Sequence, residues 1–115
     1  MRYKWKDKTA GENMARAELN LAGKQLELVR SLKEINDNVI VVYVNGKPIS
    51  EPWIQNNIPS IIEAWEPGNL GGKAVAEIIF GDINPSGKLP LTVPRSVGQL
   101  QICLLYTSDA ADECD

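Results

Sequence analysis

Residues 39–44 read VIVVYV, an apolar and mostly β-branched run in which no polar residue stands at alternate positions. A strand that is apolar on both sides is typical of a parallel sheet with helices packed on each face. The next four residues, NGKP at 45–48, are turn formers and end the strand. The run therefore predicts a central strand of an α/β fold.

The segment before this strand predicts an amphipathic helix over residues 22–35, AGKQLELVRSLKEI. Leu28, Leu32 and Ile35 recur at i, i+4 and i+7, a spacing that places them on one face of a helix. The polar residues NDN at 36–38 end it. The apolar face of this helix is expected to cover the sheet.

The chain after the strand repeats the pattern. A short helix is expected after residue 50, with Ser50 as its N-cap and Pro52 in its first turn. SIIEAW at 60–65 predicts a second strand, and KAVAEIIF at 73–80 predicts a helix that Gly81 would cap at its C-terminus. Since crossovers between neighbouring parallel strands are right-handed, this order favours a parallel sheet with helices on its faces.

The last patterned segment is KLPLTV at 88–93, where Pro90 allows only an edge strand or a loop. The predicted fold class is therefore α/β, a three-layer α/β/α sandwich fragment with a mostly parallel sheet of about three strands.

Composition narrows the function classes. The 115 residues are 43% apolar and 23% charged, with a net charge of −3, which suits one globular domain. No basic stripe indicates a nucleic-acid partner, and Lys4, Lys6 and Lys8 are expected only to solvate a loop. The longest apolar run is too short to span a bilayer, so no membrane partner is expected. The chain has no histidine, the commonest metal ligand, so neither a metal nor a cofactor is predicted.

The two ends of the chain differ from its middle. The first residues lack the apolar centre of a signal peptide, which leaves the compartment open, a periplasmic or secreted parent included. Residues 101–115 include CLLYTSDAADE, which looks like the translation of a sequencing-library adapter. Cys103 and Cys114 would then lie outside the natural protein and say nothing about disulfides. The expected organisation is a leader at 1–21, an α/β domain at 22–100 and a non-native tail at 101–115.

Residues 63–100, EAWEPGNLGGKAVAEIIFGDINPSGKLPLTVPRSVGQL, closely resemble the second, α/β-sandwich domain of family 3 glycoside hydrolases. The motifs that carry the resemblance are Ala-Trp-x-Pro-Gly, a glycine pair, Phe-Gly-Asp-x-Asn-Pro-Ser-Gly-Lys-Leu-Pro and Pro-Arg-Ser-x-Gly-Gln, found here at 64–68, 71–72, 80–90 and 94–99. The resemblance covers about residues 9–100, with Ala22 where the family commonly has proline.

The resemblance implies a part of a retaining β-glycosidase that hydrolyses β-linked glucosides or related sugars. In this family an aspartate nucleophile belongs to a preceding barrel domain, and a glutamate on a loop of the second domain is the acid/base. Glu12 keeps the family's spacing to Arg16, with departures at Asn13 and Ala15, and is therefore the candidate acid/base. Glu18 is the fallback. The implied partners are a β-linked glycoside and the barrel domain that this sequence lacks, so the chain alone is expected to be inactive.

Other interpretations stay open. GNLGG at 68–72 could bind an anion or a nucleotide at a helix N-terminus, although a glycine pair also permits close packing. A non-catalytic α/β scaffold is the remaining alternative. Trp5 could stack on a sugar, and Asp82 is expected to cap the turn at Gly81.

Overall fold

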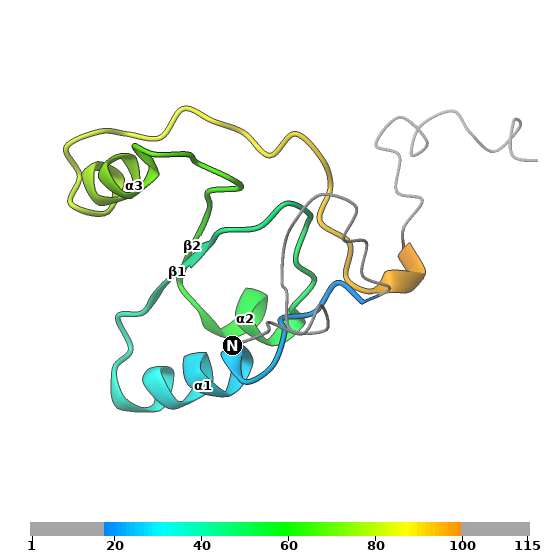
Figure 1. Cartoon of the computed structure of the whole chain (residues 1–115). Coiled ribbons are helices and arrows are strands. Elements are labelled where there is room, and N and C mark those ends of the chain that lie inside the picture. The colour runs from blue at the N-terminus through cyan, green and yellow to red at the C-terminus, as the bar shows by residue number, and fades with distance from the viewer. Residues whose placement is uncertain (1–17, 100–115) are drawn as a thin grey trace, which may run out of the picture.

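The computed structural model describes residues 18–99. Its strands β1 (Ile40–Tyr43) and β2 (Ser60–Glu63) form a parallel sheet, with Val41 in register with Ile61. The helices are α1 (Gln25–Ile35), α2 (Pro52–Asn57) and α3 (Gly71–Ile79), and a 3-10 turn, η2 (Val97–Gln99), follows (Figure 1). The predicted α/β class and the parallel pairing are confirmed.

The described residues form two strands, where about three were expected. Residues 88–93 run as a loop, which is one of the two conformations that Pro90 allowed. A proline lacks the N–H that a strand needs for its ladder.

The core lies between the sheet and the first two helices. Val41 of β1 is buried together with Ile58 and with Ile54 of α2, which is fully buried. Alternate residues of a strand point to the same face, and Val39 and Tyr43 accordingly join Val41 in this core. Figure 1 shows α1 and α2 on the same side of the sheet. The apolar side chains packed around the cluster are Leu21, Leu26, Val29, Val39, Tyr43, Trp53 and Ile61. The expectation that Leu28, Leu32 and Ile35 form the covering face of this helix is therefore wrong, because all three are exposed and α1 packs through Leu26 and Val29.

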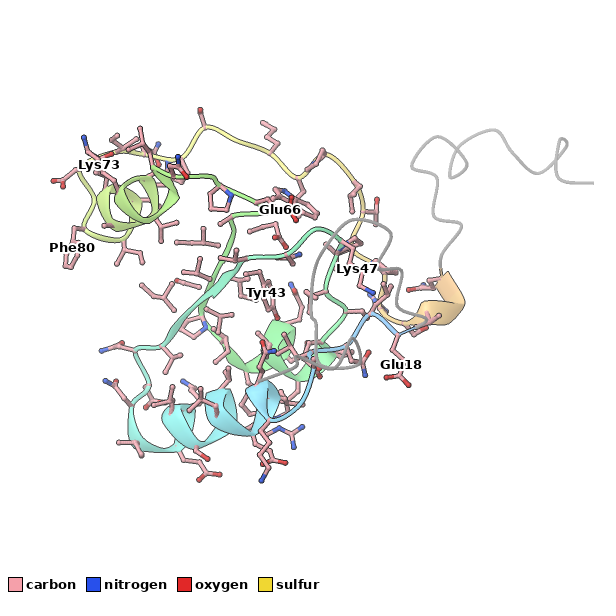
Figure 2. All side chains as sticks on the ribbon, in the orientation of Figure 1. Glu18, Tyr43, Lys47, Glu66, Lys73 and Phe80 are labelled. Atoms are coloured by element: carbon pink, nitrogen blue, oxygen red, sulfur yellow. The ribbon has the colours of Figure 1, made fainter. Side chains whose placement is uncertain are left out.

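The opposite face of the sheet is less covered. α3 lies on that side (Figure 1), yet Val44 remains 66% exposed, and Ile40 is exposed as well. Phe80, at the end of α3, points outward (Figure 2). Residues 39–44 were expected to be buried on both faces. Within the described residues, they are buried only on the face that α1 and α2 cover.

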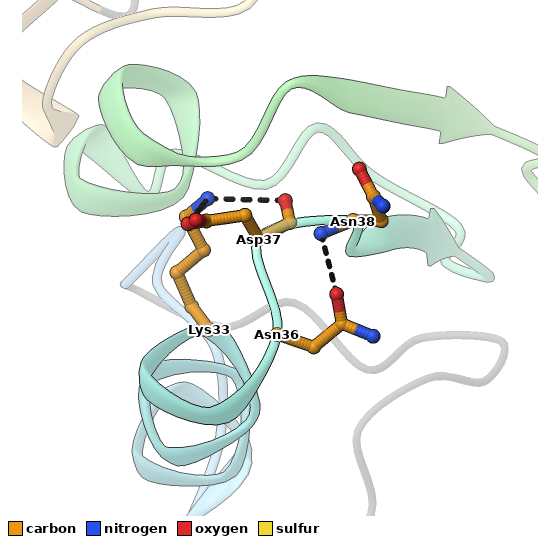
Figure 3. Close-up of polar contacts among 4 residues, drawn as sticks. All are labelled: Lys33, Asn36, Asp37 and Asn38. Atoms are coloured by element: carbon orange, nitrogen blue, oxygen red, sulfur yellow. Dashed lines mark hydrogen bonds and ion pairs between the residues drawn. The ribbon is translucent and has the colours of Figure 1, made fainter.

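Side-chain hydrogen bonds hold the turn between α1 and β1. The Lys33 ammonium donates to the Asp37 carboxylate over 2.8 Å and to the Asp37 carbonyl over 3.1 Å (Figure 3). The Asn38 N–H donates to Asn36 Oδ1 over 2.8 Å, which closes an Asx turn. The Lys33 hydrogen bond and charge lower the pKa of the Asp37 carboxyl. The NDN sequence thus ends the helix where it was predicted to.

Two helix boundaries differ from expectation. α1 begins at Gln25 and not at residue 22, because Gly23 adopts the left-handed backbone conformation with a φ of 59°. The N-cap of α2 is Glu51 and not Ser50, although Pro52 occupies the first turn as predicted. Ser50 is instead buried and bonded elsewhere.

The end of α3 matches its prediction. Gly81 has a φ of 82°, and its N–H donates to the Ile78 carbonyl while the Asp82 N–H donates to the Glu77 carbonyl over 2.8 Å. This pair of bonds is a Schellman motif, which needs a residue such as glycine in the left-handed conformation. The turn is thus closed by main-chain bonds from Gly81 and Asp82. Asp82 takes part by donating its N–H, and not by accepting backbone N–H bonds as was expected.

Candidate functional site

Glu12, the predicted acid/base, lies outside the described residues, as do Trp5, Arg16 and the lysines at 4, 6 and 8. The structure describes the chain from Glu18 onward, which is the exit of the segment that carries Glu12. The Glu18 side chain is exposed and lies at the edge of the molecule opposite Phe80 (Figure 2). Glu18 therefore marks the place where the segment that carries Glu12 joins the described fold.

The exit of the leader is attached to the turn that follows β1. Leu19 is only 6% exposed, and its carbonyl accepts a hydrogen bond of 2.9 Å from the N–H of Ser50, which is 2% exposed. The Lys47 ammonium donates to the Glu18 carbonyl over 3.1 Å. Two neighbouring carbonyls of the leader are thus bonded to one turn of the domain.

This turn lies at the carboxyl ends of the strands. The Ala64 N–H donates to the Tyr43 carbonyl over 2.9 Å and the Asn45 N–H to the Trp65 carbonyl over 3.1 Å, so the ladder continues past the strands. In open α/β sheets, ligands bind outside the carboxyl ends of the strands. The leader is therefore joined to the edge of the domain where a ligand site is expected.

Two ionisable groups at this edge are perturbed by burial. Burial raises the pKa of Tyr43 to about 12, with a contribution from the negative charges of Glu51 and Glu63. Burial also raises the pKa of the Glu63 carboxyl, although hydrogen bonds from the Trp65 N–H and the Asn45 side chain lower it in part. The edge thus favours the neutral forms of both groups.

The neighbouring backbone is held in an uncommon conformation. Trp65 has a φ of 51°, in the left-handed region that bulky residues rarely adopt. The bond from the Asn45 N–H holds its carbonyl in place. Asn45 is 8% exposed, and its Oδ1 has no hydrogen-bond partner among residues 18–99. Trp65 therefore shapes this edge.

Residues 83–95 line two open hollows together with Tyr43 at the carboxyl edge of the sheet. Cavities of about 820 Å³ and 700 Å³ lie under this segment, and Tyr43 lines both. Gln55 of α2 and Leu89 of the loop also border both spaces. Tyr43 is thus the strand residue common to the two hollows.

Gly71, the first residue of α3, has a packing role. A Cβ on Gly71 would lie 2.5 Å from the Pro67 side chain, whereas one on Gly72 would meet nothing within 4 Å. The close approach of Pro67 explains why glycine stands at position 71. The contact is with the turn before the helix and involves Gly71 alone, whereas close packing was expected of the pair.

Residues 18–99 contain neither a metal-binding cluster nor a membrane-spanning helix. No group of three or more histidine, cysteine, aspartate or glutamate side chains there could hold a metal ion. No helix there is long and apolar enough to cross a bilayer.

Sequence reasoning missed Lys47, Asn45 and Glu63 as members of this edge. One signal could have found them, because each stands at or just after the end of a strand, where parallel strands bring their following residues together. The bond from Lys47 to Glu18 has no such signal, since 29 positions separate the two residues.

Known proteins resemble this chain over most of its length. The family described as "Glycosyl hydrolase family 3 C-terminal domain" matches residues 3–113. A β-xylosidase of Formosa agariphila is 49% identical over 102 residues, which cover 89% of this chain and 14% of that protein. A periplasmic β-glucosidase of Salmonella typhimurium is 38% identical over 93 residues, 81% of this chain and 12% of that protein.

A probable β-glucosidase J of Neosartorya fischeri is 37% identical over 98 residues, 85% of this chain and 11% of that protein. The chain thus spans only a small part of the length of these relatives. The interpretation of residues 101–115 as a non-native tail stays a prediction, as does the division of the chain at 21 and 100. Because the family match covers nearly the whole sequence, the chain belongs to glycosyl hydrolase family 3, as a part of its C-terminal domain.

Proposed function

We propose that this chain supplies the general acid/base of a retaining β-glycosidase, and that Glu12 is that residue. The observation that carries the proposal is the family match over residues 3–113, a span that includes position 12. Glu12 and Arg16 keep the spacing of the family's acid/base loop. The parent protein contributes the barrel domain with the nucleophile.

The chemistry requires two carboxyl groups from different parts of the protein. In a retaining glycosidase they stand about 5 to 5.5 Å apart. The aspartate of the barrel attacks the anomeric carbon while Glu12 protonates the departing glycosidic oxygen. Glu12 then takes a proton from the water that releases the sugar from the aspartate. The chain alone carries only one of the two groups and is therefore inactive.

The attachment of the leader supports this arrangement. Leu19 and Glu18 are bonded to the turn after β1, at the edge of the sheet where α/β domains bind ligands. A glutamate carried a short distance upstream can reach past the domain towards a second domain. A loop fixed at its exit is a suitable carrier for a residue that must act across a domain boundary.

The substrates we propose are β-linked glucosides and xylosides. Two of the relatives are named β-glucosidases and the one with the highest identity of the three is named a β-xylosidase. The hydrolysed bond is an O-glycosidic bond, and the sugar at the non-reducing end is released.

The test is Glu12→Gln in the complete parent enzyme, with Glu18→Gln as the matched control. Acid/base catalysis contributes about 10²- to 10⁴-fold, so kcat/KM on an alkyl β-glycoside should fall by that factor. A dinitrophenyl glycoside should be far less affected, because its leaving group departs without a proton. Azide should restore the turnover of Glu12→Gln, because azide needs no base and can take the place of the water that Glu12 activates.

The Glu18→Gln control decides between the two glutamates. If it loses activity in this pattern while Glu12→Gln does not, Glu18 is the acid/base. If neither variant discriminates between the two leaving groups, the proposed role of this loop is wrong. Hydrolysis of the dinitrophenyl glycoside by the isolated chain would contradict the division of the two carboxyl groups between domains.

A further inference from the structure

We propose that Lys47 is a positioning residue that fixes the loop carrying the acid/base. The inference rests on the proposed function, since it concerns the placement of Glu12. It starts from the bond of 3.1 Å between the Lys47 ammonium and the Glu18 carbonyl. Lys47 does not touch the substrate in this proposal; it acts through the leader.

The distance along the chain makes such control effective. Glu12 precedes Glu18 by six positions (18 − 12). Six extended residues span at most about 20 Å. A fixed carbonyl at Glu18 therefore restricts, by chain length alone, the space within which residue 12 can lie. Every contact that fixes residues 18 and 19 narrows that space.

The anchor has a rigid base. The Asn45 side-chain amide donates to the Lys47 carbonyl, and the Asn45 N–H donates to the Trp65 carbonyl beyond β2. The main-chain bond from Ser50 to Leu19 lies on the same turn and is buried. Lys47 is thus tied on one side to the sheet and on the other to the leader.

The two anchor bonds have different roles. The Ser50 bond is buried and holds Leu19 in the apolar interior, so it contributes mainly to folding. The Lys47 bond is exposed and is made by a flexible side chain. An exposed bond of this kind stabilises the fold little, but it restrains the Glu18 carbonyl, at the point where the described chain joins the segment that carries Glu12. Loss of Lys47 should therefore change catalysis more than stability.

The effect of a misplaced acid has a recognisable signature. A shift of about 1 Å can cost 10²-fold when a group must meet a reacting atom. An alkyl leaving group needs a proton from the acid in order to depart, whereas dinitrophenolate hardly needs one. A displaced acid/base therefore lowers kcat/KM selectively for the alkyl glycoside. A general loss of structure would lower both values together.

The experiment uses the complete parent enzyme with Lys47→Met, which keeps the apolar stem and removes the donor, and Lys47→Arg, which keeps a cationic donor. Lys73→Met is the matched control. That lysine is exposed, whereas Lys47 is half-buried, and it forms a contact of 3.5 Å with Glu77, far from Lys47 in Figure 2. The kcat/KM values on alkyl and dinitrophenyl β-glycosides are measured for each variant, together with the thermal midpoint.

For Lys47→Met we expect kcat/KM on the alkyl glycoside to fall about tenfold more than on the dinitrophenyl glycoside, with an unchanged thermal midpoint. Lys47→Arg should recover most of the loss, and Lys73→Met should behave as wild type. Equal losses on both substrates, or none, would overturn the inference. Glu12→Gln measured beside them separates the two proposals: if it discriminates between the substrates while Lys47→Met does not, only the positioning role fails. If Glu12→Gln does not discriminate, the acid/base assignment fails.

Discussion

Tyr43 and Glu63 are register partners in the parallel sheet, so their side chains emerge side by side at the carboxyl ends of β1 and β2. Burial raises the pKa of both groups, and the negative charge of Glu63 raises the pKa of Tyr43 further. The pair therefore makes folding sensitive to pH on both sides of neutrality. Each group gives a separate prediction.

Glu63→Gln should stabilise the chain near neutral pH. The folded pKa of Glu63 lies above its ordinary value of 4.5, so the stability that its neutral form gives is complete below pH 4.5 and is lost as pH rises through the folded pKa. Glutamine cannot ionise and keeps an oxygen that accepts the Trp65 N–H. Urea midpoints of variant and wild type should diverge above pH 4.5 and converge below it. If Glu63→Gln destabilises the chain equally above and below pH 4.5, the shape of the side chain matters and its charge does not.

Tyr43→Phe should abolish the loss of folding stability that the wild-type chain shows at high pH. The pKa of Tyr43 is about 12 in the folded chain and 10 ordinarily, so the protection of its neutral form is present below pH 10 and is lost between pH 10 and about 12. The measurement is the urea midpoint of both proteins across this range. Parallel curves for wild type and variant would mean that another group is responsible.

Ile54→Ala should strongly destabilise the chain. Ile54 is fully buried at the centre of the cluster with Val41 and Ile58, and truncation of a buried isoleucine costs about 2–5 kcal/mol. The control is Ile35→Ala at the end of α1, where the side chain is 83% exposed, with an expected change within about 0.5 kcal/mol. Urea unfolding measures both. Similar values for the two variants would contradict the location of the core.

Gly71→Ala and Gly72→Ala should have opposite effects on stability. A Cβ at Gly71 would meet Pro67 at 2.5 Å, so alanine there overpacks the start of α3 and should cost about 1–3 kcal/mol. At Gly72 the space is open, and alanine in a helix should stabilise by about 0.5–1 kcal/mol. The difference between the two urea midpoints is the measurement. A stabilising Gly71→Ala would remove the packing explanation for the glycine at position 71.

Much of the fold could be predicted from the sequence because its signals are local. The strand at 39–44 follows from its β-branched run and the turn after it, and the end of α3 follows from Gly81. Ser50 was assigned to the wrong role because an N-cap serine and a buried serine look alike in sequence. Its N–H donates to the carbonyl of Leu19, a residue far away in the chain.

Of the candidate site, only the acid/base motif could be predicted from the sequence. The spacing between Glu12 and Arg16 is a local feature that a family resemblance can interpret. The bonds from Lys47 and Ser50 to the leader are not local, and neither residue carries a pattern that names its partner. Lysine and serine in a turn are ordinary surface residues until the fold shows what lies beside them.

The sequence by itself determined the α/β class, the parallel order of the two strands and the family, because hydrophobic periodicity, turn residues and motifs are properties of neighbouring positions. Only the tertiary structure decided that the leader leaves from the carboxyl edge of the sheet, held by Leu19 and Lys47. Burial and long-range hydrogen bonds arise when segments distant in the chain meet. Such meetings depend on the packing of the whole domain, which no single stretch of residues specifies.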